Sequence, residues 1–594
     1  MLADSLRPRP LAGHPLRGCL EARASPRVCA GLDLYTPGVP TLLCVPIMVQ
    51  DLHSALADAG AARDAGADLV EFRIDEVFSG EGDDEGERLV LKLVADSPLP
   101  CIVTCRAASE GGGYDGDDMA RVSLCERLGT ASGPGEHPPR YIDVELAAYT
   151  RSENLRRKVN LAVDHPDQKR DLRTSLILSA HDFQGRPADL TRRIIAMREQ
   201  DAAKVYKIAY RARSLRDNLE LFDLITESDR PMIALGMGEF GLMSRVLAPK
   251  FGGFLTFASL RAGSTTAPGQ PTVAELLETY RFRSIGRATR VYGVVGWPVS
   301  HSLSPLVHNA GFEAAGHDGV YVPMPVAAGA DGAASYESFK ATVGELVDHP
   351  RLGLAGCSVT LPHKENLVRL ARERGWAFDE ASGAIGAANT LVIERDVAGA
   401  VSRVRVMNTD VAGIMEPLGA ALEKMGTELP GTPVAVVGAG GAARAAAYGA
   451  ARAGARVTVY NRTHAKAERM AAELAGSAGA GVSAARWEEL PSSECRVYIN
   501  CTSVGMKGGP APSESAVPVG ALAARLGRGV VAFDTVYAPP VTPFIAAARA
   551  AGWGTIDGVD MFVRQAAGQF EAWTGRGAPR GLFERLVREA STRA

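Results

Sequence analysis

The sequence has few of the features that mark disulfide-stapled, membrane-spanning or nucleic-acid-binding proteins. Its 594 residues contain nine cysteines, an odd number without a C-x-x-C pair, which argues against a disulfide framework or a structural zinc site and indicates a reducing compartment. No apolar run approaches the ~20 residues of a membrane span. The net charge of −3 offers no basic surface for nucleic acid. We therefore expect no metal and no membrane or nucleic-acid partner, and only local positive charge for a small anionic substrate.

What remains is a composition typical of soluble globular proteins, with 46% hydrophobic and 22% charged residues. A chain of this length exceeds a single core, and a prior of ~150 residues per domain predicts two to four domains.

The first 40 residues differ from the rest of the chain. They carry Arg7, Arg9, Arg17, Arg23 and Arg27 against three acidic residues, and they show little apolar periodicity. This pattern is typical of an organelle transit peptide, which would place the protein in a plastid. It also fits a disordered leader on a cytoplasmic protein, and both interpretations stay open.

Eight short apolar runs follow, separated by stretches with helical periodicity. Strands that alternate with helices pair in parallel, and eight such units in about 220 residues predict a closed (β/α)8 TIM barrel. The runs lie at residues 41–49, 69–75, 101–106, 141–146, 175–181, 204–210, 231–237 and 253–259.

Alternation along these runs gathers ionisable side chains on one face of the predicted sheet. Successive side chains of a strand point to opposite faces, so Glu71 and Arg73 share a face that Val70 and Phe72 do not. The groups lie near the C-terminal ends of the strands, where barrel enzymes place their active sites, although a structural ion pair inside the barrel is the alternative. The polar face also receives Thr104, Arg106, Asp143, Glu145, Ser179, His181 and Lys207.

A second type of unit begins with "VVGAGGAARA", in which Gly438, Gly440 and Ala443 follow the apolar strand 434–437 and open a helix. The first glycine permits a tight turn, the second lets the backbone approach a pyrophosphate, and the helix N-terminus offers free N–H groups. A plain strand-to-helix turn in an Ala/Gly-rich chain is the alternative. The context favours a Rossmann dinucleotide site.

The next strand predicts which dinucleotide binds. An NAD enzyme places a carboxylate about 20 residues past the glycines, whereas Asn461, Arg462 and Thr463 stand there. Without a carboxylate to repel a 2′-phosphate, and with an arginine able to bind it, the site should prefer NADP. Lys466 would add to this clamp.

Short motifs of residues 291–594 occur in the order found in one enzyme family. They are "SHSLSP", "VTLPHK", "GAANT", "NTD", "GAGGAAR", "NRT", "NCTSVGM" and "GVDMFVRQ". With them this half resembles shikimate dehydrogenase. The resemblance implies that Lys364 and Asp410 are the catalytic pair, in keeping with the proton donor that ketone reduction needs. It implies that shikimate is bound by Ser302, Ser304, Thr360, Asn389 and Gln565, with Tyr537 and Gln569 nearby.

The same resemblance gives the cofactor, NADP, its own set of contacts. These are Gly438, Ala439, Gly440, Gly441, Ala442, Asn461, Arg462, Thr463, Lys466, Thr502, Met506, Thr535 and Gly558. Taken alone, Lys364 would be read as a solvated surface lysine, and Ser302 and Ser304 as helix caps. One departure from bacterial members is Ser358, where they usually carry Asn.

The first half resembles a type I 3-dehydroquinate dehydratase over about 41–275, through "EFRID", "TCR", "EGG", "SAHDF", "YKIA" and "TTAPGQ". The resemblance implies that Lys207 forms a Schiff base with the C3 ketone and that His181 is general base and then acid. Burial and nearby arginines would favour the neutral amine that must attack. Without Lys207 on the same face, His181 would be read as a core histidine. Substrate would be held by Glu71, Arg73, Arg106, Glu110, Arg245, Thr266 and Gln270.

Joined in this order, the halves resemble the plant-type bifunctional dehydratase/dehydrogenase enzymes. The implied function is conversion of 3-dehydroquinate to 3-dehydroshikimate and then to shikimate, by a chain expected to act as a monomer. The alternatives are a dehydratase/quinate dehydrogenase and a non-catalytic regulator built on the same domains. The expected segments are a leader (1–40), the barrel (41–275), a linker (276–290), a shikimate lobe (291–413), a Rossmann lobe (414–559) and returning C-terminal helices (560–594).

Overall fold

The computed structural model describes residues 40–165, 173–263, 269–478 and 481–593. Residues 1–39 of the predicted leader and the predicted substrate ligand Thr266 lie outside the described residues. The described chain forms three sheets, of eight, six and six strands.

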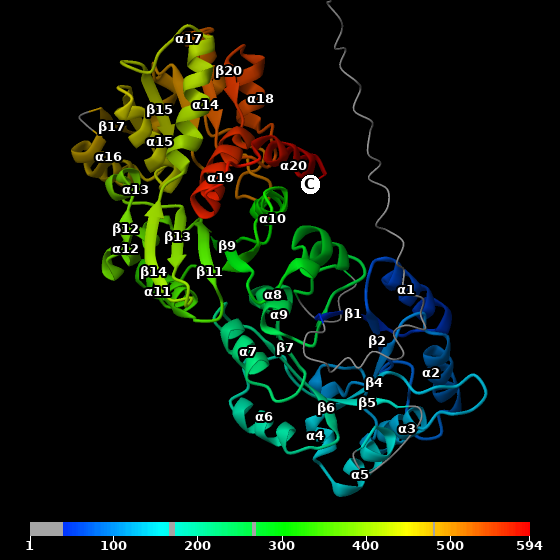
Figure 1. The fold of residues 1–594 in the computed structure, drawn as a ribbon. Coiled ribbons are helices and arrows are strands. Elements are labelled where there is room, and N and C mark those ends of the chain that lie inside the picture. The colour runs from blue at the N-terminus through cyan, green and yellow to red at the C-terminus, as the bar shows by residue number, and fades with distance from the viewer. Residues whose placement is uncertain (1–39, 166–172, 264–268, 479–480, 594) are drawn as a thin grey trace, which may run out of the picture. The chain divides into compact units, whose positions relative to one another are not determined.

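Parallel strands form the first sheet at each of the eight predicted runs (Figure 1). Pairing runs in order from β1 to β7, and β8 pairs with β1. The Phe254 N–H donates to the Met232 carbonyl (2.9 Å) and links the start of β8 to that of β7. The predicted (β/α)8 barrel is therefore confirmed. Its strands are β1 Leu42–Met48, β2 Leu69–Arg73, β3 Cys101–Thr104, β4 Tyr141–Glu145, β5 Ser175–Asp182, β6 Ala203–Arg211, β7 Met232–Met237 and β8 Leu255–Phe257.

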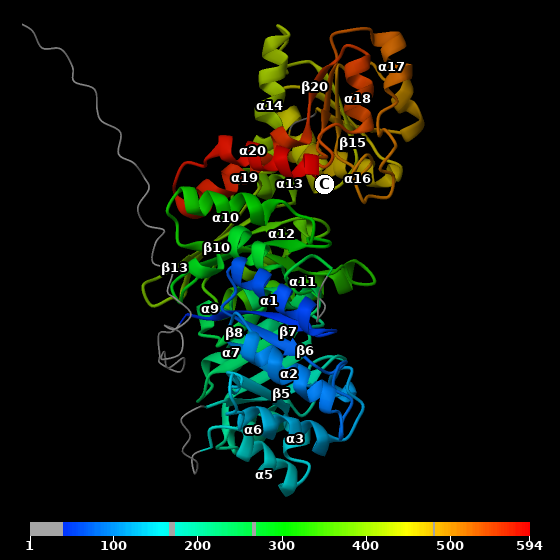
Figure 2. The ribbon, with the colours of Figure 1, turned by 90° about the vertical axis from the view of Figure 1, so that its right-hand side faces the viewer.

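Helices surround the barrel strands, as Figure 2 shows for α1, α2 and α3. Side chains of one strand parity, including Phe72, Tyr206 and Ile208, are buried in the apolar core of this half. Several helices begin at a side-chain cap; the Asp51 carboxylate, for example, accepts the Ser54 N–H at the start of α1. The helices are α1 Leu52–Asp64, α2 Asp84–Asp96, α3 Asp118–Gly129, α4 Leu146–Tyr149, α5 Glu153–Ala162, α6 Leu190–Arg198, α7 Asp217–Thr226, α8 Leu242–Val246 and α9 Ala248–Phe251.

The second sheet is mixed, with the order β10-β9-β11-β13-β14-β12. β13 runs antiparallel to β11 and β14, so the chain reverses at this sheet before it enters the third. Its strands are β9 Arg290–Gly296, β10 Gly319–Pro325, β11 Leu354–Val359, β12 Ala377–Phe378, β13 Thr390–Arg395 and β14 Val401–Met407, and its helices are α10 Ser304–Ala314, α11 Gly332–Asp348, α12 Lys364–Arg374 and α13 Glu380–Ile385.

The third sheet is parallel throughout, with the doubly wound order β17-β16-β15-β18-β19-β20 that defines the predicted Rossmann lobe. One face packs against α14, α15 and α16, and the other against α17 and α18. Its elements are α14 Asp410–Lys424, β15 Pro433–Val437, α15 Gly441–Arg452, β16 Arg456–Tyr460, α16 His464–Ala478, β17 Val482–Ala485, β18 Val497–Asn500, α17 Val519–Leu526, β19 Val531–Asp534, α18 Pro543–Ala550 and β20 Gly554–Ile556.

Two C-terminal helices follow, α19 (Gly558–Thr574) and α20 (Arg580–Arg593). α19 packs against the second sheet, where the Trp573 indole N–H donates to the Leu391 carbonyl of β13 (2.9 Å). This return brings Gln569 of α19 into contact with Ser358 of β11 and Thr390 of β13.

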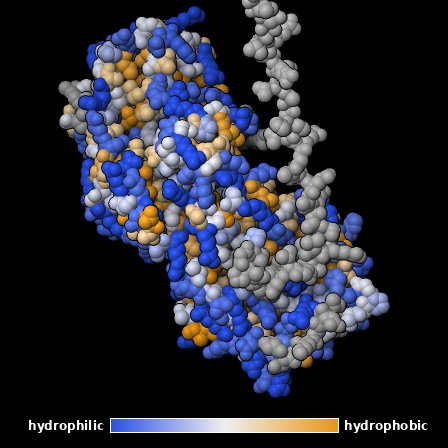
Figure 3. Space-filling view, viewed as in Figure 1, coloured by the Kyte–Doolittle hydropathy of each residue, from blue (hydrophilic) through white to orange (hydrophobic). Residues whose placement is uncertain are grey.

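The described surface is largely hydrophilic on the face shown in Figure 3, where hydrophobic residues form small separate groups. None of the described helices has both the length and the apolar character that a membrane span requires. Within the same described ranges, no cluster of three or more His, Cys, Asp or Glu side chains is placed to hold a metal ion.

Candidate functional site

The barrel pocket is built around Lys207, which lies in the middle of β6. Its ammonium lies 2.8 Å from an oxygen of Asp143 and 3.3 Å from an oxygen of Glu71. The Phe257 ring centroid is 4.7 Å from the same nitrogen. Pocket residues are Glu71, Arg73, Arg106, Glu110, Gly111, His181, Phe183, Lys207, Ala209, Leu235, Met237, Arg245, Phe257 and Gln270.

Buried ion pairs surround that lysine. Arg106 lies 2.8 Å from Asp143, and the Ser179 hydroxyl donates to the same carboxylate (2.6 Å). Burial would raise the pKa of Asp143, but Arg106 and Lys207 hold it well below its usual value. The sequence argument placed both carboxylates on the same face as Lys207, but it considered only burial and the arginines when it predicted the charge of the lysine.

His181 is paired with Glu110. Its Nδ1 lies 3.0 Å from a Glu110 oxygen, and its backbone N–H donates to the same oxygen (2.9 Å). Burial, with the charges of Arg106 and Lys207, lowers the pKa of His181 well below its usual value. Burial raises the pKa of Glu110 to about 7. A neutral imidazole held in a fixed orientation is therefore available to accept a proton.

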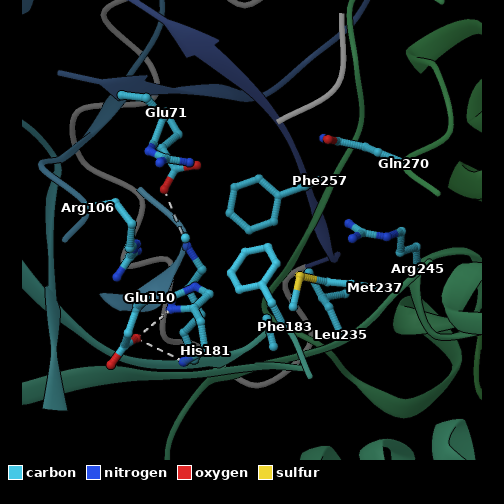
Figure 4. A pocket seen from close by; sticks show the side chains of 14 residues that line it. Glu71, Arg106, Glu110, His181, Phe183, Leu235, Met237, Arg245, Phe257 and Gln270 are labelled. Atoms are coloured by element: carbon cyan, nitrogen blue, oxygen red, sulfur yellow. Dashed lines mark hydrogen bonds and ion pairs between the residues drawn. The ribbon is translucent and has the colours of Figure 1, made fainter. Parts of the chain in front are cut away.

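Arg245 faces the pocket from the side opposite Glu71, Arg106 and Glu110 (Figure 4). Its side chain is 2% exposed, and it has no hydrogen-bond or ion-pair partner among the described residues. Burial lowers its pKa to about 10. A buried guanidinium with unused donors at a pocket wall can bind an anion such as a carboxylate. By contrast, Arg73 is already held by both oxygens of Asp75, at 2.9 Å each.

A second cluster of charged side chains forms where the second and third sheets meet. The Lys364 ammonium at the start of α12 lies 2.5 Å from Asp410 at the start of α14. The Asn389 amide donates to the other Asp410 oxygen (2.9 Å). Asp410 and Asn389 are buried, and the Lys364 side chain is 14% exposed. The sequence-predicted pair is thus in direct contact and is oriented by a third predicted residue.

Gln569 is positioned by protein groups on all of its amide atoms. Its oxygen accepts the Ser358 hydroxyl (2.8 Å), and its nitrogen donates to the Asn389 carbonyl (3.1 Å) and the Thr390 hydroxyl (3.2 Å). The Tyr321 hydroxyl donates to Ser358 (2.6 Å) and extends this buried network. Sequence reasoning had not identified Tyr321, because a tyrosine in an apolar strand carries no signal of its hydroxyl's partner.

The remaining predicted shikimate ligands come from four separate segments of the chain. Ser302 and Ser304 lie at the start of α10, where the Ser302 hydroxyl accepts the Ser304 N–H (3.3 Å), as in a helix cap. Gln565 lies on α19 and donates to the Phe562 carbonyl (3.2 Å). Tyr537 packs on the Phe562 ring, with 4.7 Å between centroids. Thr360 follows β11, four residues before Lys364.

The glycine turn has the shape that a dinucleotide requires. Gly438 has φ +119°, and a Cβ there would lie 3.0 Å from the Cys501 carbonyl. A Cβ on Gly440 would meet nothing within 4 Å, so the space above the α15 N-terminus is open. A Cβ on Gly441 would lie 2.7 Å from Cδ of Lys364. The loop that fits a pyrophosphate therefore abuts the Lys364 side chain.

The predicted 2′-phosphate clamp follows β16. Arg462, Thr463 and Lys466 are exposed, and the Asn461 amide donates to the Thr463 carbonyl (2.9 Å). The Arg462 side chain is exposed, so its guanidinium is available to a phosphate.

The other predicted cofactor residues lie along the strand ends of the third sheet. The Thr502 hydroxyl donates to the Asn500 side-chain oxygen (2.7 Å), and the Thr535 N–H donates to the Asn500 carbonyl (3.0 Å). Met506 is 38% exposed. Gly558 packs so closely that a Cβ would lie 2.2 Å from the Val536 carbonyl. Sequence reasoning missed Asn500, which accepts hydrogen bonds from both the Thr502 and the Thr535 segments.

Both halves of the chain match known protein families. Residues 43–287 match the type I 3-dehydroquinase family, residues 294–391 the shikimate dehydrogenase substrate-binding domain, and residues 558–588 the shikimate 5′-dehydrogenase C-terminal domain. The chain is 34% identical over 559 residues to the chloroplastic bifunctional 3-dehydroquinate dehydratase/shikimate dehydrogenase of Arabidopsis thaliana, covering 92% of this chain and 84% of the relative. It is 39% identical to the NADP(+) shikimate dehydrogenase of Methanocella arvoryzae, covering 50% of this chain and 98% of the relative.

Among solved structures, the dehydroquinate dehydratase and shikimate dehydrogenase from S. pombe AroM is 25% identical, covers 92% of this chain and 98% of its own, and has a TM-score of 0.39. The match to the Arabidopsis protein runs through both halves and most of each chain. The chain belongs to the family of bifunctional 3-dehydroquinate dehydratase/shikimate dehydrogenases.

Proposed function

We propose that the chain catalyses two consecutive reactions, dehydration of 3-dehydroquinate in the barrel and NADPH-dependent reduction of 3-dehydroshikimate to shikimate in the second half. The observation that carries this proposal is the presence of two separate constellations, a buried lysine beside a histidine in one pocket and a lysine–aspartate pair beside a dinucleotide turn. The proposed segments are 41–275 for the dehydratase, 276–290 for a linker, 291–413 for the shikimate lobe, 414–559 for the NADP lobe and 560–594 for the returning helices.

In the dehydratase, neutral Lys207 attacks the C3 carbonyl carbon, and loss of water leaves an iminium. His181 then removes a C2 proton, and the electrons of that C–H bond move into the enamine. The enamine expels the C1 hydroxyl, which leaves as water with the proton returned by His181. Hydrolysis of the product iminium restores the lysine. Arg245 holds the substrate carboxylate on the opposite wall of the pocket.

In the dehydrogenase, the glycine turn at Gly438 and Gly440 and the Arg462 guanidinium would hold NADPH, which when bound would supply a hydride to the ketone carbon. Lys364 gives a proton to the carbonyl oxygen, and Asp410, 2.5 Å away, keeps the ammonium directed at that oxygen. Asn389 donates to the far oxygen of Asp410 (2.9 Å) and so prevents the carboxylate from rotating. Ser302, Ser304, Thr360 and Gln565 are the proposed contacts to the hydroxyl and carboxylate groups of shikimate.

One assay tests both halves and their order. The purified protein is given 3-dehydroquinate and NADPH, and NADPH absorbance is followed. We expect oxidation that depends on 3-dehydroquinate. No oxidation with 3-dehydroquinate, together with full activity on 3-dehydroshikimate, would disprove the dehydratase assignment. Activity with quinate and NADP equal to that with shikimate would favour the quinate dehydrogenase alternative, and no activity in either half would favour the regulator.

Replacing Arg245 should change stability and function in opposite directions. Arg245→Met removes a buried cation that has no partner among the described residues, so the free protein should become more stable. The substrate carboxylate loses a charge-assisted hydrogen bond, so KM for 3-dehydroquinate should rise by about 10–100-fold with a smaller change in kcat. Melting temperature and steady-state kinetics measure both effects. Arg211→Met, at the exposed end of β6, is the control. An unchanged KM in Arg245→Met would contradict the assignment.

Arg462 should set the preference for NADPH. Arg462→Ala removes the proposed contact to the 2′-phosphate, so KM for NADPH should rise by about 10–100-fold while the weak use of NADH stays the same. The ratio of kcat/KM for the two cofactors is the measurement. Arg456→Ala, at the other end of β16, should leave that ratio unchanged. Equal losses with both cofactors would show that Arg462 does not contact the phosphate.

We also propose that the arginine-rich leader directs the protein to a plastid and that one chain suffices for both reactions. The composition of residues 1–40 and the chloroplastic relative support the first point. Import into isolated plastids with shortening of the chain tests it, and sedimentation of the active protein tests the second.

A further inference from the structure

A line of buried charges leads out of the barrel pocket to a helix on its outer surface. Asp143, which contacts Lys207, is paired with Arg106 (2.8 Å). Arg106 also lies 3.1 Å from Glu145, the last residue of β4. Glu145 in turn is bound by Arg121 of α3. Four ion pairs, in which positive and negative side chains alternate, thus join Lys207 to a helix that does not line the pocket.

Arg121 is buried, and several hydrogen bonds fix its guanidinium in this position. It is 4% exposed, and its guanidinium donates to the Cys105 carbonyl (2.9 Å) as well as to Glu145. Its remaining N–H groups donate to Asp118 at 2.8 and 2.6 Å. Glu145 is 2% exposed, and one of its oxygens also accepts the Ala107 N–H (3.0 Å). Both residues therefore hold the loop that carries Arg106.

We propose that Arg121 and Glu145 are positioning residues of the dehydratase, which keep Arg106 shared between two carboxylates and thereby keep Asp143 correctly placed on Lys207. This inference rests on the dehydratase activity proposed above. Neither residue touches the substrate, since neither lines the pocket.

The physical reason is charge balance in a site of low polarity. If Arg121 is removed, Glu145 keeps a buried charge with one cation fewer, and it draws Arg106 toward itself. Asp143 then loses its arginine partner, so its carboxylate moves and no longer holds the Lys207 nitrogen in the position from which it attacks the ketone.

The first test is the rate at which borohydride traps the 3-dehydroquinate adduct under saturating substrate. Arg121→Met should slow trapping on the order of 10–100-fold, while KM changes less, because small misplacements of a reacting group have effects of this size. Mass spectrometry should still find one adduct per chain at the end of the reaction, because every chain is folded and reacts, only more slowly. Arg121→Lys, which keeps the charge, should recover part of the rate.

Two internal controls come with the same chain. Dehydrogenase activity with 3-dehydroshikimate reports folding of the other half and should not change. Arg151→Met removes another arginine that binds Asp118 but is exposed and does not contact Glu145, and it should trap at the wild-type rate.

The decisive variant removes both charges. Arg121→Met with Glu145→Gln restores charge balance, so it should trap faster than Arg121→Met alone. A purely structural role predicts the reverse, a double variant slower than either single variant, and that result would overturn the inference. So would a wild-type rate in Arg121→Met. If Arg121→Met does not fold, the trapping rates of Arg121→Lys and of the double variant are compared with the wild-type rate in its place. A wild-type chain that forms no adduct would instead refute the proposed Schiff base.

Discussion

Lys207→Ala should abolish dehydration, with a loss on the order of 10⁴-fold or more, because Lys207 is the one amine among the described residues that line the pocket. The same protein should reduce 3-dehydroshikimate at the wild-type rate, since Lys364 and Asp410 lie in a different constellation. Dehydratase activity is followed by the ultraviolet absorbance of the product and dehydrogenase activity by NADPH oxidation. Borohydride with 3-dehydroquinate should add mass to the wild-type chain at Lys207 and none to the variant.

Lys204→Ala is the matched control for that result. Lys204 lies three residues earlier on the same strand, at a bulge where the β5–β6 register shifts, and it does not line the pocket. It should keep dehydratase activity close to wild type. Equal losses in the two lysine variants would show that the effect comes from disruption of β6, and a trapped adduct in Lys207→Ala would contradict the assignment of the nucleophile.

Lys364→Ala should stop reduction and spare dehydration, the mirror image of the first result. Loss of a positioned proton donor costs about 10²–10⁴-fold in rate, and the buried Asp410 is left without its cation. NADPH oxidation with 3-dehydroshikimate is the measurement, and 3-dehydroshikimate should accumulate when the variant is given 3-dehydroquinate and NADPH. Loss of both activities would contradict two independent sites.

Lys340→Ala serves as the control for Lys364. Lys340 is an exposed lysine of α11 that pairs with Glu373, so its loss should leave both activities unchanged. Asp410→Asn gives a second comparison, because it keeps the shape of the side chain but removes the charge that directs Lys364. We expect a smaller loss of reduction in Asp410→Asn than in Lys364→Ala. The opposite order would make Asp410 the principal proton donor.

Local patterns accounted for most of the fold. The eight barrel strands appear where short apolar runs predicted them, because alternation and run length are properties of neighbouring residues. The same alternation put Glu71, Arg106, His181 and Lys207 on one face, and the structure gathers them in one pocket. The glycine turn could be predicted equally well from the sequence, since Gly438 has a positive φ that residues other than glycine avoid.

The sequence by itself determined the order of the elements, the polar face of the barrel and the position of the dinucleotide turn, because each depends on residues close together in the chain. Only the tertiary structure decided which charges meet. It paired Lys207 with Asp143, left Arg245 without a partner among the described residues, and bound Arg121 to Glu145 across 24 positions. Those contacts depend on how separate strands and helices pack, and no spacing within one segment encodes that.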